Sequence, residues 1–153
     1  MNEQNFRALL TELFQMANTA PPGEAAAHAQ LEIDGINFTL MDGAAMEEGS
    51  LAYFCDFGPV PHNADRAEIL QRLLECNLLM FGVGTPTFSV NFETGNAMLM
   101  GRAELAQIDA KKLLNAFVHY AAQARQWGQT YFLENKQRTR SKTQHRLFTA
   151  AEA

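Results

Sequence analysis

The segment from Leu70 to Phe88 constrains the fold most strongly, because its first part reads as a helix that is apolar on two adjacent sides. One apolar stripe comprises Ile69, Leu73, Cys76 and Met80, and the other comprises Leu70, Leu74, Leu78 and Phe81. A surface helix usually shows a single apolar stripe of somewhat over about 100°. We therefore expect this helix to be covered twice, once by its own sheet and once by the same helix of a second copy.

The remaining sequence predicts two further helices and five strands. Apolar residues recur at helical spacing over residues 6–17 and 114–121. Alternation of apolar and polar residues predicts strands at residues 31–33, 36–40, 51–57, 88–92 and 97–102. The order is helix, three strands, helix, two strands, helix. This order indicates an α+β domain with an antiparallel sheet of about five strands and three helices.

Local signals mark several boundaries between these elements. The Asp34-Gly35 pair favours a type I′ hairpin turn. Asp65, with Glu68 three residues later, and Asp109 stand where the second and third helices are expected to begin. The glycines at positions 82 and 84 follow a helix and precede a strand, which is the reverse of the order in a phosphate-binding loop. We interpret them as a helix end and turn.

The charge of the chain divides it into a body and a tail. Residues 1–134 carry 7 basic and 16 acidic side chains, a net charge of −9, whereas residues 135–153 have a net charge of +4. We expect a single domain in the body, which is long enough to bury a core, and a flexible basic tail. A continuation of the last helix, or a contact between the tail and the acidic body, is the alternative.

The same composition bears on partners and location. Phosphate binding needs clustered lysine and arginine, so the acidic body argues against nucleic acid as the main partner, although a weak contact through the tail stays open. No run reaches the roughly 18 apolar residues that span a bilayer. The N-terminus has no basic region before an apolar block. We therefore expect a cytoplasmic protein without membrane insertion.

No catalytic, cofactor-binding or metal-binding motif is recognisable. Cys55 falls in a predicted strand and Cys76 in the apolar helix, and we expect both to be buried thiols. The histidines are His28, His62, His119 and His145. Their spacing does not match that of a metal site or a nucleophile pair. We expect no enzyme activity and no cofactor; an enzyme that uses Cys55 or a histidine is the alternative.

The strands carry more large apolar side chains than one small core obviously needs. Met98 and Met100 lie on the same side of the last predicted strand. Methionine pairs are typical of adaptable peptide-binding surfaces, because the thioether side chain repacks easily. A sheet edge beside such a pair would accept an extended peptide as an added strand.

Three local motifs, in this order, resemble the Tir chaperone (CesT-type) family, the class I chaperones of bacterial type III secretion. They are LEIDG at residues 31–35, LLECNL at residues 73–78 and GVGTPTF at residues 82–88. The sequence departs from the family pattern at Cys76, where alanine is common, and at residues 88–90, where Leu-Gly-Leu is common. Both departures keep the apolar pattern. The resemblance covers about residues 3–134.

The resemblance implies a cytoplasmic homodimer without catalytic activity, built on a twisted antiparallel sheet with three helices. Its partner would be a secreted effector, bound through an extended segment near the effector's N-terminus and kept competent for secretion. The implied dimer contacts are Ile69, Leu73, Cys76 and Met80, with the stripe that contains Leu70 packed on the chain's own sheet. The sequence leaves open which of the two stripes faces outward. The implied effector-binding residues are Leu13, Met16, Phe88, Val90, Met98 and Met100. A regulatory module that sequesters a partner protein on the same fold is the alternative.

Overall fold

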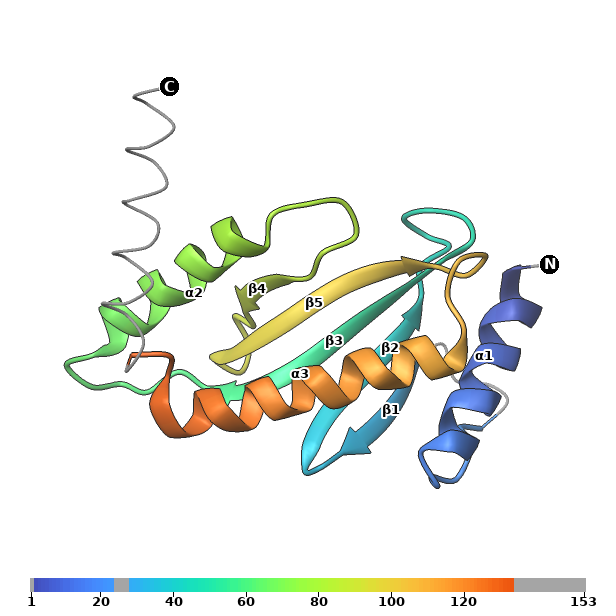
Figure 1. The fold of residues 1–153 in the computed structure, drawn as a ribbon, viewed down its shortest axis with the longest axis horizontal. Helices are drawn as coiled ribbons and strands as arrows, with labels where there is room; N and C mark the ends of the chain where they lie inside the picture. Colours follow the sequence, from blue (N-terminus) through green and yellow to red (C-terminus); the bar gives the residue numbers. More distant parts are fainter. Residues whose placement is uncertain (1, 24–27, 134–153) are drawn as a thin grey trace.

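The structure is a computed structural model that describes residues 2–23 and 28–133. The predicted tail at residues 135–153, with His145, lies outside the described residues. In chain order the elements are α1 (Asn2–Met16), β1 (His28–Ile33), β2 (Ile36–Asp42), β3 (Ser50–Pro59), α2 (Arg66–Met80), β4 (Thr87–Val90), β5 (Asn96–Glu104) and α3 (Ala110–Thr130) (Figure 1). The predicted order and the α+β class are confirmed.

The five strands form one antiparallel sheet in the order β1-β2-β3-β5-β4. Asp34 and Gly35 both have positive φ angles, 51° and 81°, as the predicted type I′ turn requires. After β3 the chain passes through α2 before it returns as β4, at the outer edge of the sheet beyond β5. The sheet therefore has two edge strands, β1 and β4, and α2 lies next to the second of them (Figure 1).

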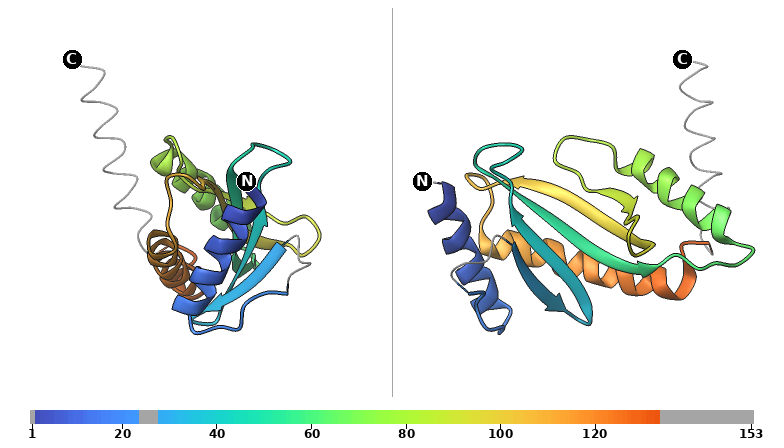
Figure 2. Two further views of the ribbon diagram at one scale, coloured as in Figure 1. Left: turned by 90° about the vertical axis from the view of Figure 1, so that its right-hand side faces the viewer. Right: turned by 180° about the vertical axis from the view of Figure 1, so that it is seen from behind.

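Helix α3 covers one face of the sheet and supplies much of the core. The ring of Phe117 stacks on Phe38 of β2, with the centroids 4.4 Å apart and an interplanar angle of 18°. Trp127 is buried nearer the end of the helix, where its ring centroid lies 6.1 Å from that of Phe57. Helix α1 packs against α3, and it lies at the opposite end of the molecule from α2 (Figures 1 and 2).

The other face of the sheet is visible when the molecule is turned by 180° (Figure 2). Strand register places Phe54 of β3 beside Met100 of β5, and Met100 beside Thr87 of β4. Directly paired residues project to the same face of a sheet. Within the described residues, the helices pack on the α3 side or beside β4, so these side chains point away from the principal core.

One predicted helix cap is confirmed and the other is wrong. The Asp109 carboxylate accepts a hydrogen bond from the Lys112 amide at 2.8 Å. Asp65 makes no side-chain cap bond and has helical backbone angles, φ −88° and ψ −2°. The side chain of Asn63 instead accepts a bond from the Asp65 amide at 2.9 Å. A turn around Asn63 therefore leads into α2, two residues before the position that the capping-box pattern indicates.

Candidate functional site

The outward side of α2 carries a row of exposed apolar side chains. Leu74, Leu78 and Phe81 are 68 %, 72 % and 89 % exposed. Spacings of four and three residues place them on one side of a helix, and we call these three residues the α2 outer stripe. Leu70 begins the same row but is partly buried against the core. Large apolar groups gathered in this way mark an interaction surface.

The orientation predicted for α2 is wrong, because the stripe predicted to face a second copy packs within the protomer, with Cys76 and Met80 partly buried against the core. Ile69 and Leu73, predicted to face a second copy, are 0 % and 4 % exposed and pack in the core of the protomer. Periodicity finds two stripes but does not say which one faces the sheet. The polar neighbours were an available signal: Gln71 and Glu75 form a hydrogen bond on the exposed side of α2, within one turn of Leu74.

The side chain of Asn77 on α2 forms hydrogen bonds with the backbone of the edge strand β4. Its side-chain amide donates to the Phe88 carbonyl at 3.1 Å, and its carbonyl accepts from the Phe88 amide at 2.7 Å. These two bonds resemble those that a neighbouring strand would make, so Asn77 satisfies backbone groups that an edge strand otherwise leaves open. The asparagine of the LLECNL motif thus has a structural role, and it closes this part of β4 to strand addition.

The open face of the sheet carries an apolar surface rich in methionine. We call Met41, Phe54, Met98 and Met100 the methionine face. Met41 and Met100 are 41 % and 37 % exposed, and the other two are partly buried. A hollow of about 410 Å³ lies over part of this face, lined also by Gly84 and Thr85 of the loop between α2 and β4 and by Thr87 of β4. The two methionines singled out from the sequence therefore do lie at a surface.

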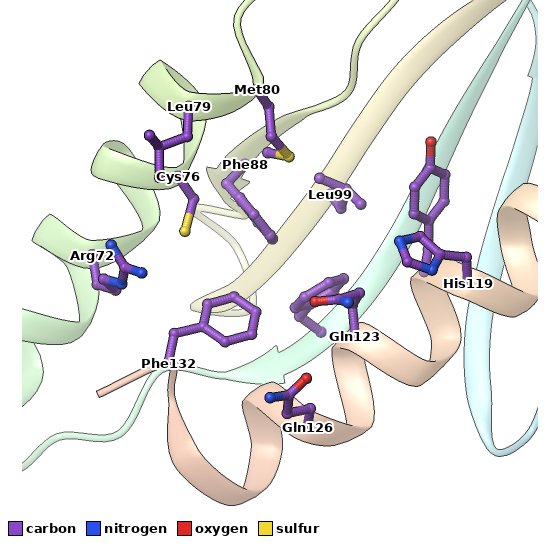
Figure 3. Close-up of a pocket in the computed structure, with 12 residues that line it drawn as sticks. Arg72, Cys76, Leu79, Met80, Phe88, Leu99, His119, Gln123, Gln126 and Phe132 are labelled. Atoms are coloured by element: carbon purple, nitrogen blue, oxygen red, sulfur yellow. The ribbon is translucent and has the colours of Figure 1, made fainter. Parts of the chain in front are cut away.

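A second hollow, the α2–α3 groove, has a volume of about 370 Å³ and opens between these two helices (Figure 3). Side chains from α2, β3, β4, β5 and α3 and from the segment after α3 meet there. The lining residues are Phe57, Arg72, Cys76, Leu79, Met80, Phe88, Leu99, His119, Tyr120, Gln123, Gln126 and Phe132. Sequence patterns did not indicate this groove, because its walls come from segments far apart in the chain.

The six predicted effector-binding residues do not form one surface. Leu13 is 0 % exposed and Phe88 is buried, so both belong to the core. Register places Val90 on the same side of the sheet as Phe88, opposite to Met98 and Met100. Met16 is exposed but lies on α1. Of the six residues, Met98 and Met100 share one surface, and their effector-binding role stays a prediction.

The cysteines do not have the environment of catalytic thiols. Burial raises the pKa of the Cys55 thiol to about 12, with a smaller contribution from the charge of Asp56. Burial also raises the pKa of Cys76, although the nearby charge of Arg72 acts in the opposite direction. A nucleophilic cysteine needs a lowered pKa. Both thiols are therefore protonated at neutral pH.

Residues 2–23 and 28–133 contain no group of three or more histidine, cysteine, aspartate or glutamate side chains placed to hold a metal ion. None of the helices in this part of the chain combines the length and apolar character needed to cross a membrane.

Comparison with known proteins finds one matching protein family and several solved structures of similar fold. The model of the Tir chaperone protein (CesT) family matches residues 8–128. The ExsC–ExsE complex has a similar fold, with a TM-score of 0.63 and 15 % identity over 83 % of this chain and 92 % of that chain. The HopA1–SchA chaperone–effector complex gives a TM-score of 0.62 and 16 % identity, over 83 % and 97 % of the two chains.

The ExoT–SpcS complex from Pseudomonas aeruginosa is also similar, with a TM-score of 0.55 and 18 % identity over 82 % of this chain and 98 % of that chain. A search of curated protein sequences finds no match. At these identities the solved structures establish a common α+β fold. The family match covers most of the chain, and the chain belongs to the Tir chaperone protein (CesT) family.

Proposed function

We propose that this protein is a cytoplasmic, non-catalytic chaperone of bacterial type III secretion. It binds an extended N-proximal segment of a secreted effector and keeps that segment soluble and competent for secretion. The observation that carries the proposal is the family match over residues 8–128. The similar chains solved in complex with effectors, and the apolar surfaces described above, support it.

The methionine face is the surface that we assign to the effector. A disordered segment loses conformational entropy when it binds, so the contacts must offset that cost. A sheet face lined by methionine and phenylalanine offers apolar area, and its flexible side chains adapt to several sequences. Asn77 closes β4 at Phe88, which leaves β1 as the more suitable edge for an added strand.

The α2 outer stripe is the surface that we assign to a second copy of the chain. Burying a leucine side chain contributes about 1.5–3 kcal/mol to the free energy of association. In a two-fold symmetric interface, each residue is buried once in each of the two copies. In the protomer, Leu74, Leu78 and Phe81 are exposed and do not belong to the core. A dimer also presents two methionine faces, so one long effector segment gains effective concentration by occupying both.

The proposal is tested in the native bacterium by deleting the gene and following proteins that co-purify with the tagged chaperone. We expect a co-purifying secreted protein to become insoluble and to leave the secreted fraction in the deletion strain. Complementation with Met98→Asp/Met100→Asp should fail, with affinity for the isolated partner lowered at least about 100-fold. Val118→Asp, at an exposed position on α3, is the control and should restore secretion.

Two results would contradict the proposal. If the co-purifying protein is secreted unchanged in the deletion strain, the chain does not act as its secretion chaperone. A co-purifying protein that never leaves the cell would instead indicate a module that sequesters its partner.

A further inference from the structure

The segment after α3 turns the chain toward the α2–α3 groove. Tyr131 and Phe132 have positive φ angles of 51° and 59°, which residues other than glycine adopt rarely, and α3 ends just before them at Thr130. Ring contacts hold this turn. The Tyr131 ring centroid lies 4.9 Å from that of Trp127. The Phe132 centroid lies 6.4 Å from that of Phe88 on β4, so the chain leaves α3 beside the groove.

The tail that follows is therefore attached at the mouth of the groove. Phe132 forms part of the groove wall, and its ring points inward (Figure 3). Leu133 is the last described residue, and residues 134–153 continue directly from it. A segment attached beside a binding site reaches an effective concentration on the order of millimolar there. The chain's own tail thus competes for the groove ahead of molecules at micromolar concentration.

The sequence of the tail combines a basic stretch with one apolar pair. Leu147 and Phe148 are the only large apolar side chains in residues 134–153. The basic side chains precede the pair and are Lys136, Arg138, Arg140, Lys142 and Arg146. Their charge is opposite in sign to the net charge of residues 1–134, and this attraction favours a tail that stays close to the body.

The dimensions of the tail and the groove agree. Leu147 follows Leu133 by 14 residues, and an extended chain of that length spans up to about 46–50 Å. The wall on α3 runs from His119 to Gln126, which is about 10 Å of helix, so the tail is long enough to turn back into the groove. The hollow of about 370 Å³ is near the lower end of the roughly 300–1,000 Å³ of small-molecule pockets, so it suits one or two side chains.

The chemistry of the groove suits an apolar pair. Cys76 and Met80 of α2 and Phe88 of β4 form its apolar side. Arg72 is buried in the wall, where its Nη1 donates to Glu75 Oε2 at 3.3 Å, and the ion pair balances the charge locally. Uncharged side chains therefore enter this groove without the loss of hydration that a charged group would suffer.

The groove is distinct from the surface that we assign to the second copy. At 100° per residue, Cys76 lies about 200° around α2 from both Leu74 and Leu78. The α2 outer stripe thus faces away from α3, while Cys76 and Met80 face toward it (Figure 3). A copy packed on the stripe would leave the groove open, so the attached tail is the occupant closest at hand.

We propose that residues 134–153 turn back over their own chain and close the α2–α3 groove, with Leu147 and Phe148 inserted beside Cys76. The basic stretch spans the distance from the end of α3 to this contact along the acidic body. The tail removes an apolar hollow from solvent, and the apolar surfaces that stay accessible are the methionine face and the α2 outer stripe. This intramolecular contact does not rest on the proposed function.

Cys76 is a built-in reporter for this contact. Among the described residues it is partly exposed in the groove, whereas Cys55 is 0 % exposed and serves as an internal control. The full chain is treated with N-ethylmaleimide, and mass spectrometry of tryptic peptides follows the alkylation of each cysteine. Leu147→Asp/Phe148→Asp should raise the rate at Cys76 at least about 10-fold, because two buried apolar side chains no longer hold the tail.

Two further variants sharpen the test. Thr143→Asp/Gln144→Asp adds the same two charges at polar positions of the same tail and should leave the rate at Cys76 unchanged. Leu74→Asp/Leu78→Asp disrupts the surface assigned to the second copy, and Cys76 should stay protected in it because the tail belongs to the same chain. Alkylation of Cys55 should remain slow throughout, which shows that the fold is intact.

Equal rates at Cys76 in the unaltered chain and in Leu147→Asp/Phe148→Asp would overturn the proposal. So would equal acceleration by the two tail variants, because charge rather than an apolar contact would then hold the tail. Loss of protection in Leu74→Asp/Leu78→Asp would assign the groove to a second copy. The assay uses the isolated chain without any partner, so its failure is distinct from a failure of the secretion assay in the native host.

Discussion

Helices α2 and α3 both carry apolar residues at helical spacing, but they use them differently. On α3 the apolar side is buried within the chain, with Phe117 and Trp127 at 0 % and 1 % exposed. On α2 only Ile69, Arg72 and Leu73 are buried. The two leucines of the outer stripe, Leu74 and Leu78, are exposed to solvent. The same kind of pattern therefore serves folding in one helix and, as we propose, association in the other.

The difference follows from what each helix has to cover. Helix α3 lies along one face of the sheet and meets several strands, which gives its apolar side a partner over much of its length (Figure 1). Helix α2 lies beside the short edge strand β4, and four residues of strand cannot cover two apolar stripes. An excess of apolar surface on a helix at a sheet edge is thus a sign of a missing partner.

The largest expected effect concerns the α3 side. Phe117→Ala removes a ring that stacks on Phe38, and it should lower the free energy of unfolding by about 3–5 kcal/mol. Urea denaturation at fixed protein concentration measures the change. Val118→Ala, at the next position and exposed, should stay within about 0.5 kcal/mol. Equal losses for the two variants would show that α3 does not supply the core.

The second prediction concerns association through α2. Leu74→Asp/Leu78→Asp should raise the dissociation constant of the dimer at least about 1,000-fold, because four leucine side chains leave the interface. Sedimentation velocity measures this constant, and circular dichroism checks that the monomer stays folded. A double variant that remains dimeric would place the interface elsewhere, whereas one that unfolds would place these leucines in the core.

The third prediction concerns the junction between α2 and β4. Asn77→Leu keeps the approximate size but removes both bonds to the Phe88 backbone, and it should lower the free energy of unfolding by about 2–4 kcal/mol. Amide hydrogen exchange at Phe88 should become faster. Gln71→Leu removes an exposed α2 amide and should change stability little. Unaltered exchange at Phe88 would contradict the role given to Asn77.

The smallest effect tests how tightly the α3 side is filled. A Cβ at Gly101 would overlap the ring of Tyr53, so Gly101→Ala should cost about 1–3 kcal/mol of stability. A Cβ at Gly128 of α3 would meet no other atom within 4 Å, and Gly128→Ala should stabilise by up to about 1 kcal/mol. Thermal denaturation distinguishes the two signs, and a stabilising Gly101→Ala would show that the Tyr53 ring moves freely.

The sequence predicted the features that depend on neighbouring residues. The order of elements, the Asp34-Gly35 turn and the Asp109 cap follow from local patterns, and the structure has all three. The exposed Met100 was also identified, because alternation along a strand separates its two faces.

The errors concern relations between distant segments. Leu13 was assigned to the effector surface through the family resemblance, but it is fully buried, and α1 packs on α3. The stripe that contains Ile69 was assigned to a second copy because periodicity does not show which side of a helix its own sheet covers, and Ile69 and Leu73 pack within the protomer. The groove between Cys76 and Gln123 depends on the packing of two helices and has no local signature.

The mass of the intact chain in solution tests the central claim most directly. Sedimentation equilibrium at micromolar concentration should give twice the chain mass of 17.0 kDa, because we assign the exposed α2 outer stripe to a second copy of the chain. A mass of one chain, unchanged as the concentration rises, would contradict the account: Leu74, Leu78 and Phe81 would then be exposed without a second copy to cover them.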